Sequence, residues 1–462
     1  MLFSSLEFLY LFLPWTVLVY FAVPRKAKNA VLLFASLLFY AVGEPKYLFL
    51  MLTVTVANFI FGRLADNERH SRRFCRTALI FAVIFNISAL FFFKYFDFAA
   101  SLLGFSPLGL ALPIGISFYI FQALSYVADV YRGDVTPSRN IVDFSAYVSF
   151  FPQLIAGPIV RYSDVDNALR CRKHDFGNAA EGLRRFCAGL SKKVLLANRA
   201  GAVWERLSAL PEGEISTATV WLGALFYAFQ IYFDFSGYSD MAIGLGKIFG
   251  FDFPENFNYP YISRSVSEFW RRWHITLSSF FRDYVYIPLG GNRRGRARTY
   301  LNLFAVWCLT GIWHGASGNF LLWGIYYFFL LTLEKAFLGK ILKRIPAVIA
   351  HAYTLTAVLV GWVIFAADTL KDGFFAYEKD MFLLGGAPLI SQSAIYELSR
   401  NSVLLVIMIF ASTPIPKKLF FRAAGTKAAS RIAQNALSLL SLLLSTATLV
   451  NSGYNPFLYF RF

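Results

Sequence analysis

The sequence contains little charge. Of the 462 residues, 15% are Asp, Glu, Lys or Arg, whereas about a quarter of an ordinary soluble domain is charged. This deficit excludes a globular cytosolic enzyme. Acidic residues are the scarcer kind, since 27 of them accompany 44 Lys and Arg and leave a net charge of +17. The basic residues lie in short loops between apolar runs, as expected of a membrane protein, so we expect no nucleic acid partner.

Apolar runs long enough to cross a bilayer recur along the chain. About 20 apolar residues span the hydrocarbon core as a helix. The sequence therefore predicts an all-α, polytopic protein embedded in membrane lipid, with roughly ten or more transmembrane or re-entrant helices. The candidate runs are residues 2–23, 30–62 with one break, 77–96, 110–130, 217–235, 300–333, 351–365, 402–410 and 436–450.

No Lys or Arg precedes the first apolar run, which carries Glu7 and is followed directly by Arg25, Lys26 and Lys28. A cleavable signal peptide has the opposite polarity. We therefore expect a retained helix with its N-terminus outside. The bias of Lys and Arg then places the loop at Arg25 and the basic loop at residues 69–76 on the cytoplasmic side.

Cysteines are few and scattered, without any C-x-x-C pair. This spacing favours neither a zinc site nor a disulfide framework, and we expect no metal. The sequence also lacks a repeat with a period of 20 to 50 residues, which excludes a solenoid and weakens the case for a transporter built from obvious repeats. The four cysteines are Cys75, Cys171, Cys187 and Cys308.

Polarity divides the chain into three parts. Residues 1–131 are almost entirely apolar, residues 132–339 hold most of the mixed polar sequence, and residues 340–462 return to plain apolar runs. We expect a single membrane domain whose middle part is the catalytic core. Within that core, residues 150–158 place two prolines and a glycine in apolar sequence, which predicts a re-entrant loop lining a cavity. An ordinary loop at the interface is the alternative.

His314 is the strongest candidate for a catalytic residue. It lies in the apolar run 300–333, about 20 Å along a helix that begins at Tyr300. An ionisable side chain at membrane depth is costly and usually marks a functional path. A neutral imidazole there can act as a general base toward a hydroxyl, and a structural histidine bonded to a carbonyl is the alternative. Gly311 and Gly315 form a G-x-x-x-G pair, which predicts close approach of a helix or a ligand.

An amphipathic helix is predicted to begin at Ser265. Ser265 and Glu268 have the spacing of a capping box, and apolar residues then recur every three or four positions. Such a helix fits one lying in the membrane interface. Arginine binds phosphate oxygens bidentately, so its arginines are candidates for donor binding, with membrane anchoring as the alternative. The helix carries Arg271, Arg272 and His274, and a second basic cluster contains Arg293 and Arg294.

Polar residues also interrupt an aromatic run. Gln230 and Asp234 lie one helical turn apart on the same face, and Asp240 follows. A buried carboxylate needs a partner, which His274, His314 or a nearby arginine can supply. A carboxylate bonded to an imidazole fixes its tautomer. A structural ion pair between helices explains these carboxylates equally well.

Six segments together resemble the membrane-bound O-acyltransferase family. The nearest branch holds the membrane subunit of alginate O-acetyltransferase and peptidoglycan O-acetylation proteins, and the teichoic-acid D-alanylation branch is less similar. The segments are residues 150–161 (FFPQLIAGPIVR), 230–244 (QIYFDFSGYSDMAIG), 269–278 (FWRRWHITLS), 281–292 (FRDYVYIPLGGN), 311–315 (GIWHG) and 454–462 (YNPFLYFRF).

The resemblance implies a multi-helix fold around a central tunnel, an intramembrane catalytic histidine and a thioester donor on the cytoplasmic face. The catalytic histidine of the family maps to His314. An earlier histidine of the family maps to His274, as a second catalytic residue or as a structural or donor-positioning one. The residues expected to support them are Asp234, Asp240, Gln230, Trp313 and Asn319.

The resemblance further implies acetyl transfer from acetyl-CoA, used as a substrate with no bound cofactor, toward an exported cell-envelope polysaccharide such as alginate. It places the protein in the bacterial cytoplasmic (inner) membrane beside an exported, esterase-like acetyltransferase. The chain itself lacks the Gly-x-Ser-x-Gly elbow of such esterases. Peptidoglycan O-acetylation and teichoic-acid D-alanylation are the alternatives, and a non-catalytic scaffold for polysaccharide export or assembly is an alternative of another class.

Overall fold

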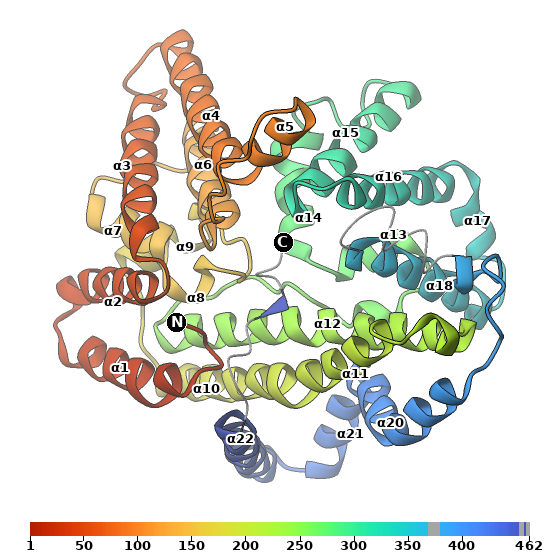
Figure 1. Ribbon diagram of the computed structural model, residues 1–462. Coiled ribbons are helices and arrows are strands. Elements are labelled where there is room, and N and C mark those ends of the chain that lie inside the picture. Colours follow the sequence, from red (N-terminus) through yellow and green to blue (C-terminus); the bar gives the residue numbers. More distant parts are fainter. Residues whose placement is uncertain (368–378, 452–456, 459–462) are drawn as a thin grey trace. The chain divides into compact units, whose positions relative to one another are not determined.

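The computed structural model describes residues 1–367, 379–451 and 457–458, and every regular element in these residues is a helix (Figure 1). The predicted all-α class is thus confirmed. Seven of the helices are long and apolar enough to cross a membrane, which makes the chain a multi-pass membrane protein. They are Arg25–Gly43, Pro45–Leu64, Arg72–Lys94, Gly318–Leu342, Ala347–Ala366, Gln392–Ala411 and Ala428–Val450, and Phe8–Ala22 is a shorter apolar helix.

Seven spans do not confirm the expected count of ten or more crossings, which stays a prediction together with the central tunnel. The run at residues 217–235 belongs to α12, Thr217–Ile248, which is 32 residues long and not among the seven. Most of its side chains are buried in the protein. A helix that is hydrophobic all round and covered by protein is a core helix of the fold.

The chain divides into two compact units, and the division falls within α12. Unit 1 comprises Met1–Leu190, Tyr238–Glu255 and the described part of Leu449–Phe460. Unit 2 comprises Ser191–Gly237 and the described part of Asn256–Thr448. The expectation of one domain in three parts stays a prediction.

Unit 1 is held together by apolar helices with a few satisfied polar contacts. The amide of Asn58 on α3 exchanges two hydrogen bonds of 2.8 and 3.0 Å with the amide of Asn86 on α4. Ser71 begins α4 as its N-cap by accepting a hydrogen bond from the Phe74 N–H. The helices are η1 (Phe8–Phe12), α1 (Leu13–Ala22), η2 (Arg25–Ala27), α2 (Lys28–Gly43), η3 (Pro45–Tyr47), α3 (Leu48–Leu64), α4 (Arg72–Lys94), α5 (Phe96–Leu102), α6 (Ile116–Arg132), α7 (Ile141–Ser149), α8 (Phe151–Leu154), α9 (Tyr162–Arg170) and α10 (Phe176–Ser191).

The predicted re-entrant segment is a short helix, α8, in a stretch that is buried throughout residues 150–160. Side chains satisfy its backbone, because the Phe151 N–H donates to Ser36 Oγ at 3.1 Å and the Tyr147 hydroxyl donates to the Val160 carbonyl at 3.0 Å. Such compensation is what irregular backbone at membrane depth requires. Complete burial does not fit an ordinary interfacial loop, and the cavity expected beside it stays a prediction.

Unit 2 contains the segments that carry most of the candidate residues. Its helices are η4 (Lys192–Ala197), α11 (Asn198–Ser208), η5 (Glu212–Glu214), the first part of α12, η6 (Pro260–Ile262), α13 (Val266–Arg272), α14 (Ile275–Phe281), η7 (Arg282–Tyr286), α15 (Arg296–His314), α16 (Gly318–Leu333), η8 (Glu334–Leu338), α17 (Gly339–Leu342), α18 (Ala347–Ala366), α20 (Gln392–Ala411), α21 (Ile415–Ala424) and nearly all of α22 (Lys427–Val450). The segment 454–462 lies outside the described residues except for Phe457 and Leu458, which are buried.

Candidate active site

His314 ends a helix instead of lying within a long one. α15 stops at His314, the backbone turns at Gly315, and α16 begins at Gly318 beside α15 (Figure 1). The prediction of one apolar span over residues 300–333 is therefore wrong. The reason is local, since Gly315 takes up extended backbone and glycine is a poor helix former. The two halves form an antiparallel hairpin, with His314 at its turn.

Glycines set the spacing of this hairpin. A Cβ on Gly311 would lie 2.4 Å from the carbonyl oxygen of Phe320, and a Cβ on Gly324 would lie 2.4 Å from that of Trp307. These contacts leave no space for a side chain, so the backbones of α15 and α16 touch directly. The close approach predicted at Gly311 is confirmed, and its partner is a helix.

Aromatic rings surround the His314 imidazole. The residue is 8% exposed, and its ring centroid lies 5.1 Å from those of Trp323 and Phe365, both in edge-to-face geometry. The adjacent Trp313 ring lies at 4.9 Å. Trp323 comes from α16 and Phe365 from α18, so three helices fix the orientation of this imidazole. Edge-to-face contacts of this kind are stabilising and directional.

His274 interrupts the predicted amphipathic helix. The helix begins as expected, because Ser265 Oγ accepts a hydrogen bond from the Glu268 N–H. However, it ends at Arg272, and a new helix starts at Ile275. His274 between them has left-handed backbone, with φ at 43° and ψ at 54°. The prediction of one continuous helix is therefore wrong.

The break is stabilised by the loop at residues 256–258. The Ile275 N–H donates to the Asn256 carbonyl at 3.0 Å, and the Asn258 N–H donates to the Arg272 carbonyl at 2.9 Å. These bonds replace those that a continuous helix would have made. Sequence periodicity does not predict such a break, because the contacts that cause it come from outside the helix.

Asn256 also fixes the tautomer of His274. Its Oδ1 accepts hydrogen bonds from the Thr276 N–H at 3.3 Å and from the Thr276 hydroxyl at 2.9 Å, and His274 Nδ1 lies 3.0 Å from it. A backbone N–H can only donate, so this amide atom is the oxygen and Nδ1 carries the proton. Nε2 is then the basic nitrogen, and it makes no hydrogen bond within the described residues. Burial lowers the pKa of His274 to about 3, which keeps the imidazole neutral.

Trp313 links the two histidines. Its ring centroid lies 6.1 Å from that of His274 and 4.9 Å from that of His314. The His274 ring also packs against the Phe235 ring, with centroids 4.7 Å apart. The structure thus brings together three predicted site residues, His274, His314 and Trp313, in one buried aromatic cluster of unit 2.

Glu334 anchors the helix that precedes His274, and the sequence analysis missed it. Its two carboxylate oxygens accept hydrogen bonds from the N–H groups of Val266 and Ser267 at 2.7 and 2.8 Å. A carboxylate at a helix N-terminus compensates both the unpaired N–H groups and the helix dipole. In the sequence, its role is indicated only by its position as a single acidic residue directly after the apolar run of α16.

Comparison with known proteins identifies the family. Residues 135–343 match the model of the membrane-bound O-acyltransferase family. Over the whole of both chains, the sequence is 40% identical to a probable alginate O-acetylase, AlgI, of Pseudomonas putida. It is 35% identical to a peptidoglycan O-acetyltransferase of Helicobacter pylori, over 89% of this chain and 86% of that one. It is 27% identical to a teichoic acid D-alanyltransferase of Bacillus subtilis, over 55% of this chain and 68% of that one.

The chain belongs to the membrane-bound O-acyltransferase family. The resemblance inferred from the six segments is thereby confirmed, and the protein is an O-acyltransferase. The family match spans both histidines of the aromatic cluster and α13 to α15, which hold them.

In this acyltransferase the two predicted carboxylates have cationic partners. Asp234 pairs with Lys193 at 2.6 Å, and each side chain is only 3% exposed. Lys193 lies on η4 and was not considered from the sequence, because two adjacent lysines before an apolar run resemble a loop of the positive-inside type. The pair joins η4 to α12, which is the structural ion pair that the sequence analysis left open.

Asp240 belongs to unit 1 and pairs with Arg185 of α10 at 2.9 Å. Arg185 also binds the carboxylate of Glu255. Burial lowers the pKa of Arg185, but the hydrogen bonds and charges of Glu255 and Asp240 outweigh burial and hold that pKa above its ordinary value. An arginine partner was one of the expected possibilities, and the geometry is that of a clamp between α10 and α12.

Gln230 and Asn319 have packing contacts. A Cβ on Gly201 of α11 would lie 2.6 Å from Gln230 Nε2, so Gln230 fills the contact between α11 and α12. Asn319 Nδ2 donates to the Ala367 carbonyl at 2.7 Å and ties the start of α16 to the end of α18. That end carries Phe365, so Asn319 helps to position the ring beside His314.

The four predicted donor-binding arginines differ in availability. Arg272 is already paired with Glu268 at 2.9 Å and donates to the Asn258 carbonyl at 3.1 Å. Arg271, Arg293 and Arg294 are exposed. Arg272 therefore stabilises α13 and the adjoining loop, while the exposed side chains of the other three can be reached by an external anion.

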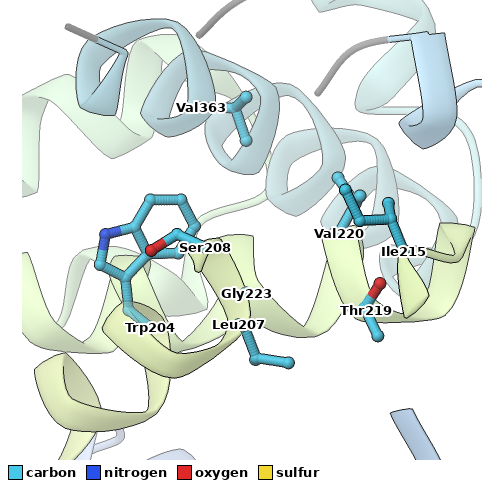
Figure 2. Close-up of a pocket in the computed structure, with 8 residues that line it drawn as sticks. All are labelled: Trp204, Leu207, Ser208, Ile215, Thr219, Val220, Gly223 and Val363. Atoms are coloured by element: carbon cyan, nitrogen blue, oxygen red, sulfur yellow. The ribbon is translucent and has the colours of Figure 1, made fainter. Parts of the chain in front are cut away.

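A small apolar pocket in unit 2 shares no lining residue with the aromatic cluster around His314 (Figure 2). It is formed by α11, α12, α18 and Ile215 in the segment before α12, and no histidine lines it. Its lining residues are Trp204, Leu207, Ser208, Ile215, Thr219, Val220, Gly223 and Val363. Across the described chain no group of three or more His, Cys, Asp or Glu side chains is arranged to hold a metal, and the four cysteines are free.

Proposed function

We propose that this acyltransferase moves an acetyl group from cytoplasmic acetyl-CoA across the bacterial cytoplasmic membrane, for O-acetylation of an exported polysaccharide of the alginate type. The observation that carries the proposal is the full-length similarity to the probable alginate O-acetylase of Pseudomonas putida. The buried pair of histidines around Trp313 supports it, since acyl transfer needs a base in a site that excludes water.

His314 is the proposed general base. An acceptor hydroxyl, of the glycan or of a partner protein, attacks the thioester carbonyl carbon, so that a C–O bond forms and the C–S bond breaks. The hydroxyl proton passes to the imidazole and then to the departing thiolate. If His314 instead accepts the acetyl group transiently, a C–N bond forms first while the C–S bond breaks and the thiolate leaves. In a second step the hydroxyl oxygen forms the C–O bond, the C–N bond breaks, and the hydroxyl proton passes to the released imidazole. In both cases His274 supports the reaction through its basic Nε2.

The donor and the partner follow from the same proposal. Arg271, Arg293 and Arg294 are the exposed cations that would meet the phosphates of acetyl-CoA, which acts as a substrate while the protein carries no bound cofactor. Arg272 would contribute mainly through its pairing with Glu268. An exported, esterase-like acetyltransferase would complete the attachment to the polysaccharide.

Peptidoglycan O-acetylation is the second candidate, favoured by the similarity to the Helicobacter pylori protein over most of both chains. Teichoic-acid D-alanylation has weaker support, because that similarity covers 55% of this chain. A non-catalytic scaffold for polysaccharide export is the alternative of another class. These candidates separate by the polymer that is modified and by whether modification depends on His314.

The test compares variants in reconstituted membranes with labelled acetyl-CoA and the partner transferase. His314→Ala is expected to lower turnover at saturating donor by about 10² to 10⁴, as is typical for loss of a general base. The paired change Arg293→Glu and Arg294→Glu is expected to raise the KM for acetyl-CoA with kcat nearly unchanged, because phosphate binding is felt equally in the ground and transition states.

Arg282→Gln is a matched control, since that exposed arginine already pairs with Asp283. Salt must be held constant, because exposed charges are screened. Wild-type acetylation by correctly inserted His314→Ala protein would support the scaffold alternative and refute the reaction proposed here. An unchanged KM in the double arginine variant would instead limit these arginines to membrane anchoring.

A further inference from the structure

A buried lysine at the start of α2 has no anionic partner. Lys28 is 7% exposed and makes no ion pair or hydrogen bond with the part of the chain that the structure describes. Its Nζ lies 4.5 Å from the ring centroid of Tyr20 and 4.9 Å from that of Phe21. The rest of the side chain is covered while Nζ still reaches the surface, so the cation–π contacts hold the ammonium group in place without supplying an opposite charge.

A second cation is fixed on the same tyrosine. Arg172 donates from Nε to the Tyr20 hydroxyl at 2.8 Å, from one terminal nitrogen to the Ala168 carbonyl at 3.1 Å, and from the other to Asn29 Oδ1 at 2.6 Å. Its guanidinium also lies 4.5 Å from the Phe251 ring centroid. All of these acceptors are neutral. Arg172 is therefore held in place without having its charge compensated by them.

His174 and Arg25 add to the same positive field. His174 Nε2 lies 3.4 Å from the Tyr20 hydroxyl. Partial burial lowers the pKa of His174, and the charges of Lys28, Arg172 and Arg25 lower it further. These three cations all act on His174 in the same direction.

Two acids on the segments that carry or adjoin these residues are engaged with neutral groups. The Asp143 carboxylate accepts a hydrogen bond from the Asn29 amide at 2.6 Å. The Asp175 carboxylate accepts one from the Asn178 N–H at 3.3 Å at the start of α10. Like charges held together raise the free energy of the folded state unless an anion joins them.

We propose that Lys28, Arg172 and His174 form a binding site for a phosphate group, which an anionic phospholipid headgroup or a soluble nucleotide such as coenzyme A would supply. Phosphate suits the arrangement because its several oxygens can accept hydrogen bonds from an ammonium, a guanidinium and an imidazole at once. All of these residues belong to unit 1, so binding here can be tested without altering the histidine cluster of unit 2.

The experiment uses the full chain purified in an uncharged maltoside detergent. Dioleoylphosphatidylglycerol and coenzyme A are titrated separately, with phosphatidylcholine as the neutral lipid, and the midpoint of thermal unfolding is followed. Lys28→Gln is compared with Lys26→Gln, a change in a neighbouring exposed lysine. We expect the wild-type midpoint to rise with one or both phosphate probes, and Lys28→Gln to need about tenfold more probe for half the effect.

The stability without any probe distinguishes a binding role of Lys28 from a purely structural one. Without any probe, Lys28→Gln should unfold at the wild-type midpoint or above it, because it removes a charge that repels Arg172. If Lys28→Gln does not fold, His174→Gln serves in its place, and we expect it to weaken probe binding about threefold.

The probe that acts identifies the source of the phosphate. A response that depends on Lys28 and is given by phosphatidylglycerol alone indicates a lipid headgroup, and a Lys28-dependent response to micromolar coenzyme A indicates the nucleotide. A coenzyme A response that is equal in the wild type and Lys28→Gln belongs to the donor site proposed above. The proposal is overturned if neither probe gives a rise in the midpoint that Lys28→Gln weakens, or if Lys26→Gln weakens the response as much as Lys28→Gln does.

Discussion

His274 adopts a backbone conformation that costs a residue with a Cβ on the order of 1 kcal/mol. The hydrogen bonds of Asn256 to the imidazole and to the following turn offset this cost. Strain of this kind is typical of residues whose direction matters more than their contribution to stability. Here it turns the imidazole into the aromatic core, with Nε2 as the basic nitrogen.

For the residue His274 we predict distinct effects of two changes at Asn256. Asn256→Asp keeps the acceptor for Nδ1 and adds a negative charge, which raises the pKa of His274 from about 3. Protonation then begins at higher pH, so the acidic limb of the rate–pH profile should move to higher pH. Asn256→Leu removes the acceptor and should lower kcat at every pH and cost about 1–3 kcal/mol of stability.

The measurement is acetyl transfer from pH 3 to pH 8 in reconstituted membranes, a range that reaches the pKa of about 3 of the wild-type His274. Thr276→Val is the control, because it removes another donor to the same Asn256 oxygen without touching the imidazole. Superimposable pH profiles for the wild type and Asn256→Asp would show that the protonation of His274 does not govern the reaction.

Among the helices, α15 and α16 are in direct backbone contact at Gly311. We predict that Gly311→Ala lowers the free energy of unfolding by about 1–3 kcal/mol, because the added methyl group would overlap the Phe320 carbonyl. It should also lower kcat, since the same hairpin holds His314 and Trp323. Gly213→Ala is the matched control, because a Cβ there meets no atom within 4 Å. Equal midpoints for the two variants in detergent would contradict the packing described.

The ion pair between η4 and α12 provides another test at the scale of helices. Lys193→Met leaves the Asp234 carboxylate buried without its lysine and should cost about 3–5 kcal/mol, while the double change Lys193→Met and Asp234→Leu should recover much of that loss. Lys247→Met breaks a pair with Glu181 of the same 2.6 Å length at a more exposed position and should cost less than about 1 kcal/mol. Denaturant unfolding of the four proteins measures these differences, and a double variant no better than Lys193→Met would refute the pairing argument.

For the whole molecule, the distribution of Lys and Arg predicts sidedness. The loops at residues 69–76 and 293–298 should both be cytoplasmic, whereas the connection at Lys46, between two spans, should be external. Single cysteines at Arg72, Arg293 and Lys46, each exposed, can be treated with an impermeant maleimide in intact cells. Only the cysteine at Lys46 should react. Labelling at Arg72 or Arg293 while the cysteine at Lys46 behaves as expected would reverse the assignment.

Hydropathy was sufficient to predict the fold class and most of the spans, because a helix embedded in lipid requires a long run of apolar residues. Local rules also predicted the cap at Ser265 and the glycine contact at Gly311. The breaks at His274 and Gly315 escaped prediction, since hydrogen bonds from Asn256 and packing between helices decide them. The partner of Asp234 was not predicted either, because Lys193 is 41 positions away in the sequence and only the fold brings the two side chains together.

Of the four thiols, Cys171 is exposed, whereas Cys75 and Cys187 are buried and Cys308 is intermediate. Burial also raises the pKa of the Cys187 thiol, which slows its reaction with alkylating reagents. A fluorophore that reacts with thiolates should therefore mark the wild-type chain chiefly at Cys171, one residue before Arg172. Its emission would report the arrival of an anion beside Tyr20 in real time, so the kinetics of binding become measurable in a protein with no engineered residue.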